Sequence, residues 1–321
     1  VDGEGKAMHK SLGNGMDPYE IMNKYGADLL RLWAASADYH ADVRCSDKIF
    51  KQLSQNYLKF RNTARYCLGN LDGFNANDLV APAEMEELDR WAITRLNALI
   101  ARCFQAYDDY EFSVITHAVN DFCVVEMSNF YLDIIKDRLY CEGKDDRLRR
   151  SAQTALYLIL DTMAKIMAPI LGFTCDEIWL AMPHADGVDA RNVLFNDMNQ
   201  VFADYALDED AMAKWNKIIE VRDVVNGALE AARTAKQIGK SLEAKVALTV
   251  PAEDAFLAEL NGDALADLLI ISQVTVTVGG EIAAEVAPAE GEKCQRCWKV
   301  LPTVSAEGLC PRCGKVIRAL V

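Results

Sequence analysis

The 321-residue sequence has no apolar run that approaches the roughly 18 residues needed to cross a membrane, and no signal-peptide pattern. It also lacks a Gly-rich nucleotide-binding motif, a nucleophile elbow and an acid pair at a suitable spacing. Its four histidines, at positions 9, 40, 117 and 184, lie far apart along the chain. We therefore expect a protein without a membrane segment, whose histidines are structural.

Basic residues are also scarce. The net charge of -14 argues against general affinity for nucleic acid, although it says nothing about local patches. Residues 200–292 hold 7 basic and 17 acidic residues, whereas residues 293–321 hold six basic residues and the single acid Glu307. A basic terminal module thus follows an acidic one. Hydrophobic residues at 51% are typical of a soluble protein, and the length allows two or three domains.

The ten cysteines form two groups. Six occur singly, mostly in apolar helical patterns, and are expected to be small buried hydrophobic residues: Cys45, Cys67, Cys103, Cys123, Cys141 and Cys175. Unpaired thiols of this kind favour a reducing, cytoplasmic compartment.

The other four cysteines form two C-x-x-C pairs twelve residues apart: Cys294, Cys297, Cys310 and Cys313. Two such turns can point four sulfurs at one metal, which predicts one structural zinc in a ribbon at residues 291–321. Disulfides are the alternative. Trp298, beside a predicted ligand, belongs either to the core, which we favour, or to a platform on which a nucleic-acid base stacks.

Helical periodicity dominates the sequence between these features. Apolar spacing predicts helices at 18–25, 27–37, 47–71, 85–107, 112–140, 145–167, 176–181 and 208–238, with Thr174 and Glu177 as a capping box. Alternating residues predict strands at 239–250 and 272–278, around a helix at 252–270. The fold class is therefore mainly α: a helical bundle, then a small α/β domain and the ribbon.

The predicted helix 47–71 has a two-sided pattern. Its polar side carries Lys48, Lys51 and Lys59 together with two amides. This side is either an ordinary solvated face or a contact for a phosphate backbone.

A glycine-flanked basic loop precedes the first helix. It reads Lys6-Ala7-Met8-His9-Lys10-Ser11-Leu12-Gly13-Asn14, and Asp17-Pro18 then starts the helix. A cationic loop before a helix N-terminus suits a phosphate, although an ordinary surface loop has the same composition.

This loop resembles the Lys-Met-Ser-Lys-Ser signature of class I aminoacyl-tRNA synthetases, and further segments resemble the isoleucine branch of that family. They include Gly26–Ser36, Asp42–Ser46, Arg61–Arg65, Ser128–Asp133, Lys136–Tyr140, Ala168–Leu171, Asp176–Trp179, Lys236–Ala244 and the terminal cysteine ribbon. The resemblance covers essentially the whole chain. It departs from the signature at Ala7, where lysine is usual, and at His9, where serine is usual.

The resemblance implies an enzyme that activates isoleucine with ATP and magnesium and esterifies it to its tRNA. Lys10 would be the catalytic lysine, and Met8, His9, Lys10 and Ser11 would form the loop at the ATP phosphates. The chain begins at Val1, just before this loop, and the family's His-Ile-Gly-His motif is not in the sequence. We therefore expect a segment of a longer protein that is inactive alone.

The resemblance also implies a division of the chain. Residues 1–45 would end the catalytic domain, 46–200 would be an anticodon-binding bundle, 201–290 a small junction domain and 291–321 the ribbon. A monomer that binds isoleucine tRNA in the cytoplasm is expected. Candidate tRNA contacts, chosen from charge placement alone, are Lys48, Lys51, Lys59, Arg296, Lys299, Arg312 and Lys315.

Two other functions compete with this interpretation. A freestanding zinc-containing module that binds tRNA or DNA would also explain the ribbon, because DNA glycosylases end in a similar one. A purely structural helical protein would leave the four cysteines and the basic terminus unexplained.

Overall fold

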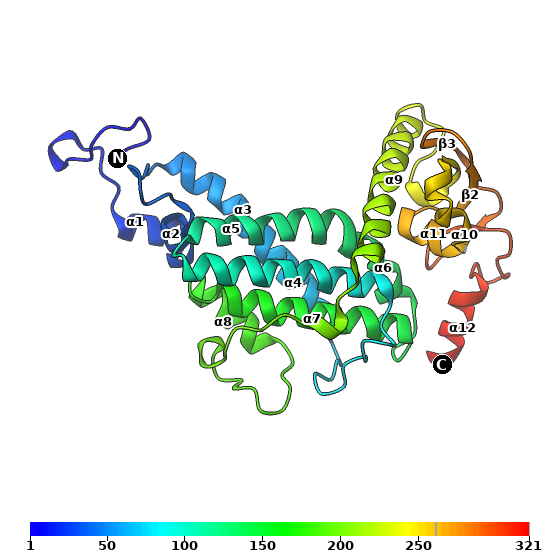
Figure 1. Cartoon of the computed structure of the whole chain (residues 1–321), viewed down its shortest axis with the longest axis horizontal. Coiled ribbons are helices and arrows are strands. Elements are labelled where there is room, and N and C mark those ends of the chain that lie inside the picture. Colours follow the sequence, from blue (N-terminus) through cyan, green and yellow to red (C-terminus); the bar gives the residue numbers. More distant parts are fainter. Residues whose placement is uncertain (261, 321) are drawn as a thin grey trace. The chain divides into compact units, whose positions relative to one another are not determined.

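The computed structural model describes residues 1–260 and 262–320, and it divides the chain into two compact units. The first comprises residues 1–133 and 150–206, and the second comprises residues 134–149 and 207–321. Figure 1 shows that long helices make up most of the chain. The predicted mainly helical fold with a small sheet region is confirmed. No helix among the described residues is long and apolar enough to cross a membrane.

The first unit is built from helices. They are α1 (Pro18–Tyr25), α2 (Ala27–Ser36), α3 (Asp47–Gly69), α4 (Glu87–Asp108), α5 (Phe112–Asp121), α8 (Gly172–Ala181) and most of α7 (Arg147–Met167). Short 3-10 turns occur at Lys10–Leu12, Val193–Phe195 and Ala203–Tyr205. From Ser151 onward α7 is almost entirely buried, so it is the central helix of this core.

The predicted helix 112–140 follows a continuous path but changes its hydrogen bonding. After α5, residues Phe122–Tyr131 form a π-helix, and α6 (Leu132–Cys141) continues from it. Ser128 Oγ donates a hydrogen bond to the carbonyl of Cys123 within this segment. Burial of Phe122, Met127 and Tyr131 holds the wider turns in place, because their side chains all lie in the core.

Two buried carboxylates cross-link the helices of the first unit. Asp89 of α4 is fully buried and accepts hydrogen bonds from Tyr131 and Ser151. Asp28 of α2 accepts hydrogen bonds from the backbone N–H groups of Phe173 and Thr174, the latter at 2.7 Å. Asp28 thereby satisfies donors at the start of α8 that no residue of α8 reaches.

This arrangement corrects one prediction. Thr174 and Glu177 do not cap a helix that starts at 176, because α8 already begins at Gly172 and has no cap from its own N-cap side chain. Thr174 instead donates its hydroxyl hydrogen to Asp28. In contrast, Asp17 and Ser46 cap α1 and α3, each accepting a hydrogen bond from a first-turn backbone N–H.

The second unit contains a three-stranded sheet in the order β2-β1-β3. Central strand β1 (Ala244–Val250) runs parallel to β2 (Gln273–Val278) and antiparallel to β3 (Ala283–Pro288). Val246 is paired with Val274 on one side and Val286 on the other. Every second residue of β1 is buried, as the alternating pattern predicted. The predicted start at residue 239 is wrong, because Ser241–Glu243 form a 3-10 turn before the strand.

Helices surround this sheet and the ribbon follows it. α9 (Glu209–Thr234) contacts β3, while α10 (Phe256–Glu259) and α11 (Gly262–Leu269) contact β2. The predicted helix 252–270 is therefore broken into a 3-10 turn at Ala252–Asp254 and two helices. The ribbon consists of β4 (Glu292–Lys293), β5 (Val300–Leu301) and α12 (Pro311–Leu320).

Candidate functional sites: a basic loop and a four-cysteine metal centre

The N-terminal loop is shaped by two polar side chains. Asn14 donates from Nδ2 to Asp2 Oδ2 at 2.9 Å and to the carbonyl of Ala7 at 3.1 Å, and its Oδ1 accepts from the N–H of His9. Asp2 also accepts from the backbone of Lys6 at 2.8 Å. Hydrogen bonds from Asn14 and Lys6 lower the pKa of Asp2. The loop is therefore held closed at its base.

The predicted phosphate-contacting residues lie at the tip of this loop. Lys10 starts the 3-10 turn, and Gly13 ends it with a φ of 62° that favours glycine. His9, Lys10 and Ser11 are exposed, whereas Met8 is half-buried against the cluster of Ile21, Cys45 and Phe50. Met8 thus anchors the loop, and the cation of Lys10 lies in solvent.

The three predicted contacts on α3 are all exposed. Lys51 forms an ion pair with Asp47, whose Oδ2 lies 2.9 Å from its Nζ. Asp47 also accepts hydrogen bonds from Lys24 and Tyr25, and the bonds from Lys24, Tyr25 and Lys51 lower its pKa. The carboxylate of Asp47 would therefore repel a phosphate that approaches Lys51, which makes Lys51 a weaker candidate contact than Lys48 or Lys59.

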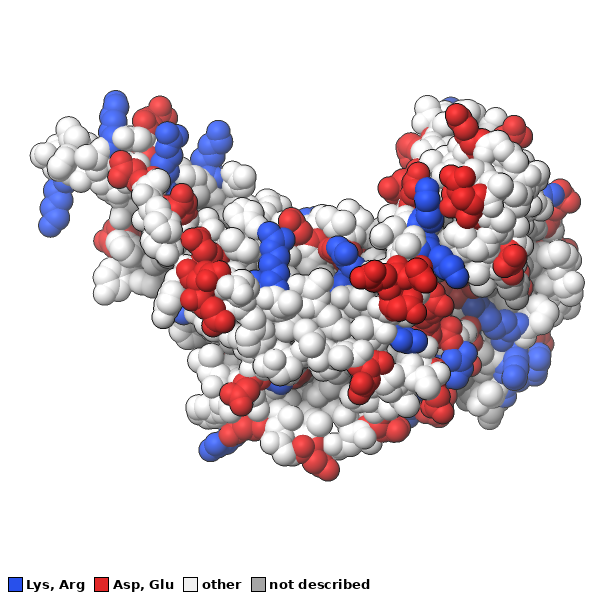
Figure 2. Space-filling model, viewed as in Figure 1, with Lys and Arg blue, Asp and Glu red and all other residues white. Residues whose placement is uncertain are grey.

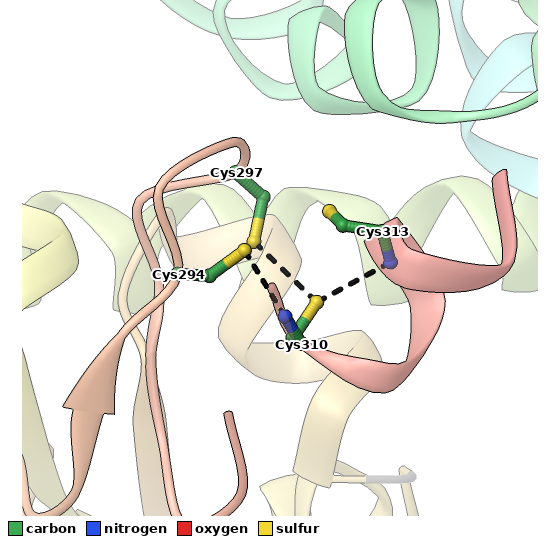
Figure 3. Close-up of side chains that lie close together, drawn as sticks. All are labelled: Cys294, Cys297, Cys310 and Cys313. Carbon is green, nitrogen blue, oxygen red and sulfur yellow. Dashed lines mark hydrogen bonds between the residues drawn. The ribbon is translucent and has the colours of Figure 1, made fainter. Parts of the chain in front are cut away.

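The four terminal cysteines meet at one point. Their Sγ atoms all lie within 4.8 Å of one another, and all four residues are buried. Figure 3 shows that Cys294 and Cys297 come from the turn between β4 and β5, whereas Cys310 and Cys313 come from the start of α12. Sulfurs bound to one zinc in a tetrahedron lie about 3.8 Å apart, and Cys297 Sγ lies 3.9 Å from Cys310 Sγ.

The local backbone suits thiolate ligands. The N–H of Cys310 donates to Cys294 Sγ at 3.3 Å, and the N–H of Cys313 donates to Cys310 Sγ. Burial disfavours the thiolate of Cys294, but backbone N–H groups outweigh this effect and lower the pKa of Cys294. Burial and the neighbouring thiols raise the pKa values of Cys297 and Cys313, as expected where four thiols share one site. Four sulfur ligands leave no open position, so the residues fit a structural zinc and not a catalytic one.

The predicted ribbon contacts differ in their surroundings. Lys299 forms an ion pair with Asp267 of α11, and Arg312 forms ion pairs with Asp137 and Glu142. Arg296 donates to the backbone carbonyls of Tyr140 and Cys141. Lys315 is exposed on α12, and Figure 2 shows Lys and Arg side chains gathered over that helix.

The prediction that Trp298 belongs to the core is wrong, because 55% of its surface is exposed. Its φ of 65° lies in the left-handed region, in the turn directly after Cys297. Lys240 Nζ lies 5.5 Å from the centre of the indole ring. An open groove of about 740 Å³ is lined in part by Gly239, which directly precedes Lys240 in the sequence. Its lining also includes Arg233, Lys236 and Lys293.

Sequence reasoning missed the residues that arrange these sites. Asp2 and Asn14 shape the loop, Asp137 and Glu142 contact Arg312, and Lys240 contacts Trp298. The turn-forming residue Asn14 was a usable local signal, since asparagine side chains often bond nearby backbone. The partners of Arg312 lie 170 and 175 residues away in sequence and gave no such signal.

Three family models match the chain, and together they point to the class I tRNA synthetases. "tRNA synthetases class I (I, L, M and V)" matches residues 1–46, "Anticodon-binding domain of tRNA ligase" matches residues 89–248, and "Zinc finger found in FPG and IleRS" matches residues 291–316. The ribbon is accordingly a structural zinc site.

The curated relatives of this chain are isoleucine--tRNA ligases. The isoleucine--tRNA ligase of Syntrophotalea carbinolica is 47% identical over 99% of this chain, and that of Geobacillus thermodenitrificans is 45% identical over 99%. The chain is thus similar to isoleucine--tRNA ligases over nearly its whole length. It spans only about a third of the length of these relatives, 36% of each.

The fold also resembles a solved structure. The LeuRS of Agrobacterium radiobacter K84, solved as a LeuRS-tRNA-LeuAMS ternary complex, aligns with a TM-score of 0.50 at 13% identity. The alignment covers 90% of this chain and 27% of that one. At this identity the likeness shows a shared fold.

Proposed function

We propose that this chain is the tRNA-binding part of an isoleucine--tRNA ligase, which activates isoleucine with ATP and magnesium and esterifies it to isoleucine tRNA. The observation that carries the proposal is the whole-chain match to isoleucine--tRNA ligases together with the match to an anticodon-binding domain. A freestanding tRNA- or DNA-binding module would not share 99% of its length with these ligases. That the protein is a monomer and lies in the cytoplasm stays a prediction.

Within the enzyme, the N-terminal loop would bring Lys10 to the ATP phosphates, with Met8, His9 and Ser11 beside it. Support comes from the closed base of the loop and the exposed Lys10 cation, which together offer a positioned positive charge. The sequence contains no His-Ile-Gly-His motif. The chain alone therefore has only one side of an active site, and we propose that it does not aminoacylate.

The division into a catalytic end at 1–45, a bundle at 46–200, a junction at 201–290 and a ribbon at 291–321 also stays a prediction. The bundle would bind the anticodon region, and the exposed Lys48, Lys59 and Lys315 are the candidate cations for phosphates. Unpaired bases stack on aromatic side chains, so the exposed Trp298 is a further candidate contact.

Replacing Trp298 with alanine tests this surface. Loss of one stacking partner costs about 1–3 kcal/mol, which predicts tRNA affinity weaker by about 5- to 150-fold. Trp298→Tyr keeps an aromatic face and should retain most of the affinity. Affinity would be measured by fluorescence anisotropy at one fixed salt concentration, together with zinc content. Unchanged binding by a zinc-loaded Trp298→Ala chain would exclude Trp298 as a contact.

A further inference from the structure

The ribbon and the segment Ile134–Arg149 belong to the same compact unit, although more than 140 residues separate them in sequence. This segment holds the end of α6 (Leu132–Cys141), the turn after it and the first residues of α7. We call it the α6–α7 corner. Three groups of contacts join it to the ribbon.

Arg312 makes the first group of contacts. Its Nη1 lies 2.6 Å from Asp137 Oδ2 and 3.0 Å from Glu142 Oε1, and its Nη2 lies 2.9 Å from Asp137 Oδ1. The two parallel hydrogen bonds to Asp137 form a bidentate pair. This geometry requires a guanidinium, because a lysine ammonium is a single point charge. Burial raises the pKa of Asp137, but the bonds from Arg312 outweigh burial and lower it.

Arg296 makes the second group. It lies between Cys294 and Cys297, and it donates to the carbonyl of Cys141 at 2.5 Å and to that of Tyr140 at 3.2 Å. These are the last carbonyls of α6, which have no partner within the helix. A cation at a helix C-terminus also interacts favourably with the helix dipole.

The third contact is apolar. Cys141, the last residue of α6, is 6% exposed and forms one buried cluster with the four predicted zinc ligands. Its thiol is therefore covered by the folded ribbon. The zinc site, Arg296 and Arg312 all meet the same short stretch of chain.

These contacts conflict with a role for Arg312 at a phosphate. Two carboxylates face its single positive charge, which leaves the group with a net negative charge. Glu142 is 8% exposed at its side chain, so this pairing is only weakly screened by solvent. A phosphate approaching Arg312 would meet Asp137 and Glu142 as well.

We propose that Arg312 and Arg296 are positioning residues that dock the zinc ribbon on the α6–α7 corner and so set where Trp298 and Lys315 meet tRNA. The docking itself rests on this structure alone, whereas its consequence for tRNA rests on the proposed function. The predicted ribbon contacts then divide into two kinds: Arg296, Lys299 and Arg312 contact protein, and Lys315 binds RNA.

Cys141 gives a direct readout of docking. The zinc-loaded chain would be treated with N-ethylmaleimide, and labelling of each cysteine would be followed by mass spectrometry alongside zinc content. In Arg312→Ala we expect Cys141 to label about tenfold faster than in the wild-type chain, because loss of the charged hydrogen bonds raises the population of the undocked state. Arg312→Lys should give an intermediate rate.

Two further variants keep the test decisive. Asp137→Asn lies outside the ribbon and should expose Cys141 with zinc still bound, even if Arg312→Ala impairs metal binding. Lys315→Ala, on the same helix as Arg312, should leave Cys141 labelling unchanged. Wild-type labelling rates in both Arg312→Ala and Asp137→Asn would overturn the proposal.

The consequence for tRNA separates this proposal from the proposed function. Lys315→Ala should reduce the slope of log affinity against log salt by about 1, as expected for one lost phosphate contact, and Arg312→Ala should not. A reduced slope in Arg312→Ala would overturn the division of roles. If the wild-type chain fails to bind tRNA, the proposed function fails, and the Cys141 labelling still decides whether Arg312 docks the ribbon.

Discussion

Removing zinc is expected to unfold residues 291–320 while the helical bundle stays folded. The ribbon has two two-residue strands and one helix, and its buried cluster consists of the four ligands and Cys141. A core this small contributes little stability, so metal binding, on the order of 10 kcal/mol in small zinc modules, supplies its folding energy. Cys310→Ser should have the same effect as chelation.

Hydrogen–deuterium exchange with a zinc assay would measure this change. We expect protection to disappear at residues 291–320 and at Cys141, with little change in α4 and α7. Cys103→Ala is the matched control, because Cys103 is equally buried but lies in α4 and not at the metal site. A Cys310→Ser chain that keeps one zinc and native protection in the ribbon would contradict the assignment.

Replacing Asp28 with alanine should destabilise the first unit by about 3 kcal/mol, because buried hydrogen bonds to a charged group are strong and their loss leaves donors unsatisfied. Asp28 is 7% exposed and accepts three hydrogen bonds from Phe173 and Thr174. The neighbouring Arg31 donates to the carbonyls of Pro169 and Ile170. Together they tie α2 to the chain leading into α8.

Urea unfolding followed by circular dichroism would test this value. Asp42→Ala is the control, since Asp42 is exposed and close in sequence, and it should change the unfolding free energy by less than about 0.5 kcal/mol. A difference between the two variants below about 1 kcal/mol would show that Asp28 is not the helix cap that the structure indicates.

Local sequence patterns predicted most of the helices. The cap of α8 was not predictable, because Asp28 lies 146 residues before Thr174, whose backbone N–H donates a hydrogen bond to it. The partners of Arg312 were not predictable for the same reason, because they lie 170 and 175 residues away in the sequence. Charge counting chose Arg296, Lys299 and Arg312 because they are basic, and it could not show which cations the fold pairs with carboxylates or carbonyls.

The metal site was predictable because its chemistry depends on short spacing. Two C-x-x-C turns place four sulfurs near one point whatever the rest of the chain does. Trp298 shows the limit of this reasoning. Its large apolar ring suggested burial, but Trp298 lies in a turn with a left-handed backbone and is 55% exposed, which only the folded chain reveals.

We propose that this chain binds isoleucine tRNA and distinguishes its anticodon. The most direct measurement is the affinity of the zinc-loaded chain for isoleucine tRNA and for the same tRNA with an altered anticodon, at one defined salt concentration. We expect the altered tRNA to bind about tenfold more weakly, because unpaired bases are recognised individually. Equal affinities for the two tRNAs would contradict this account.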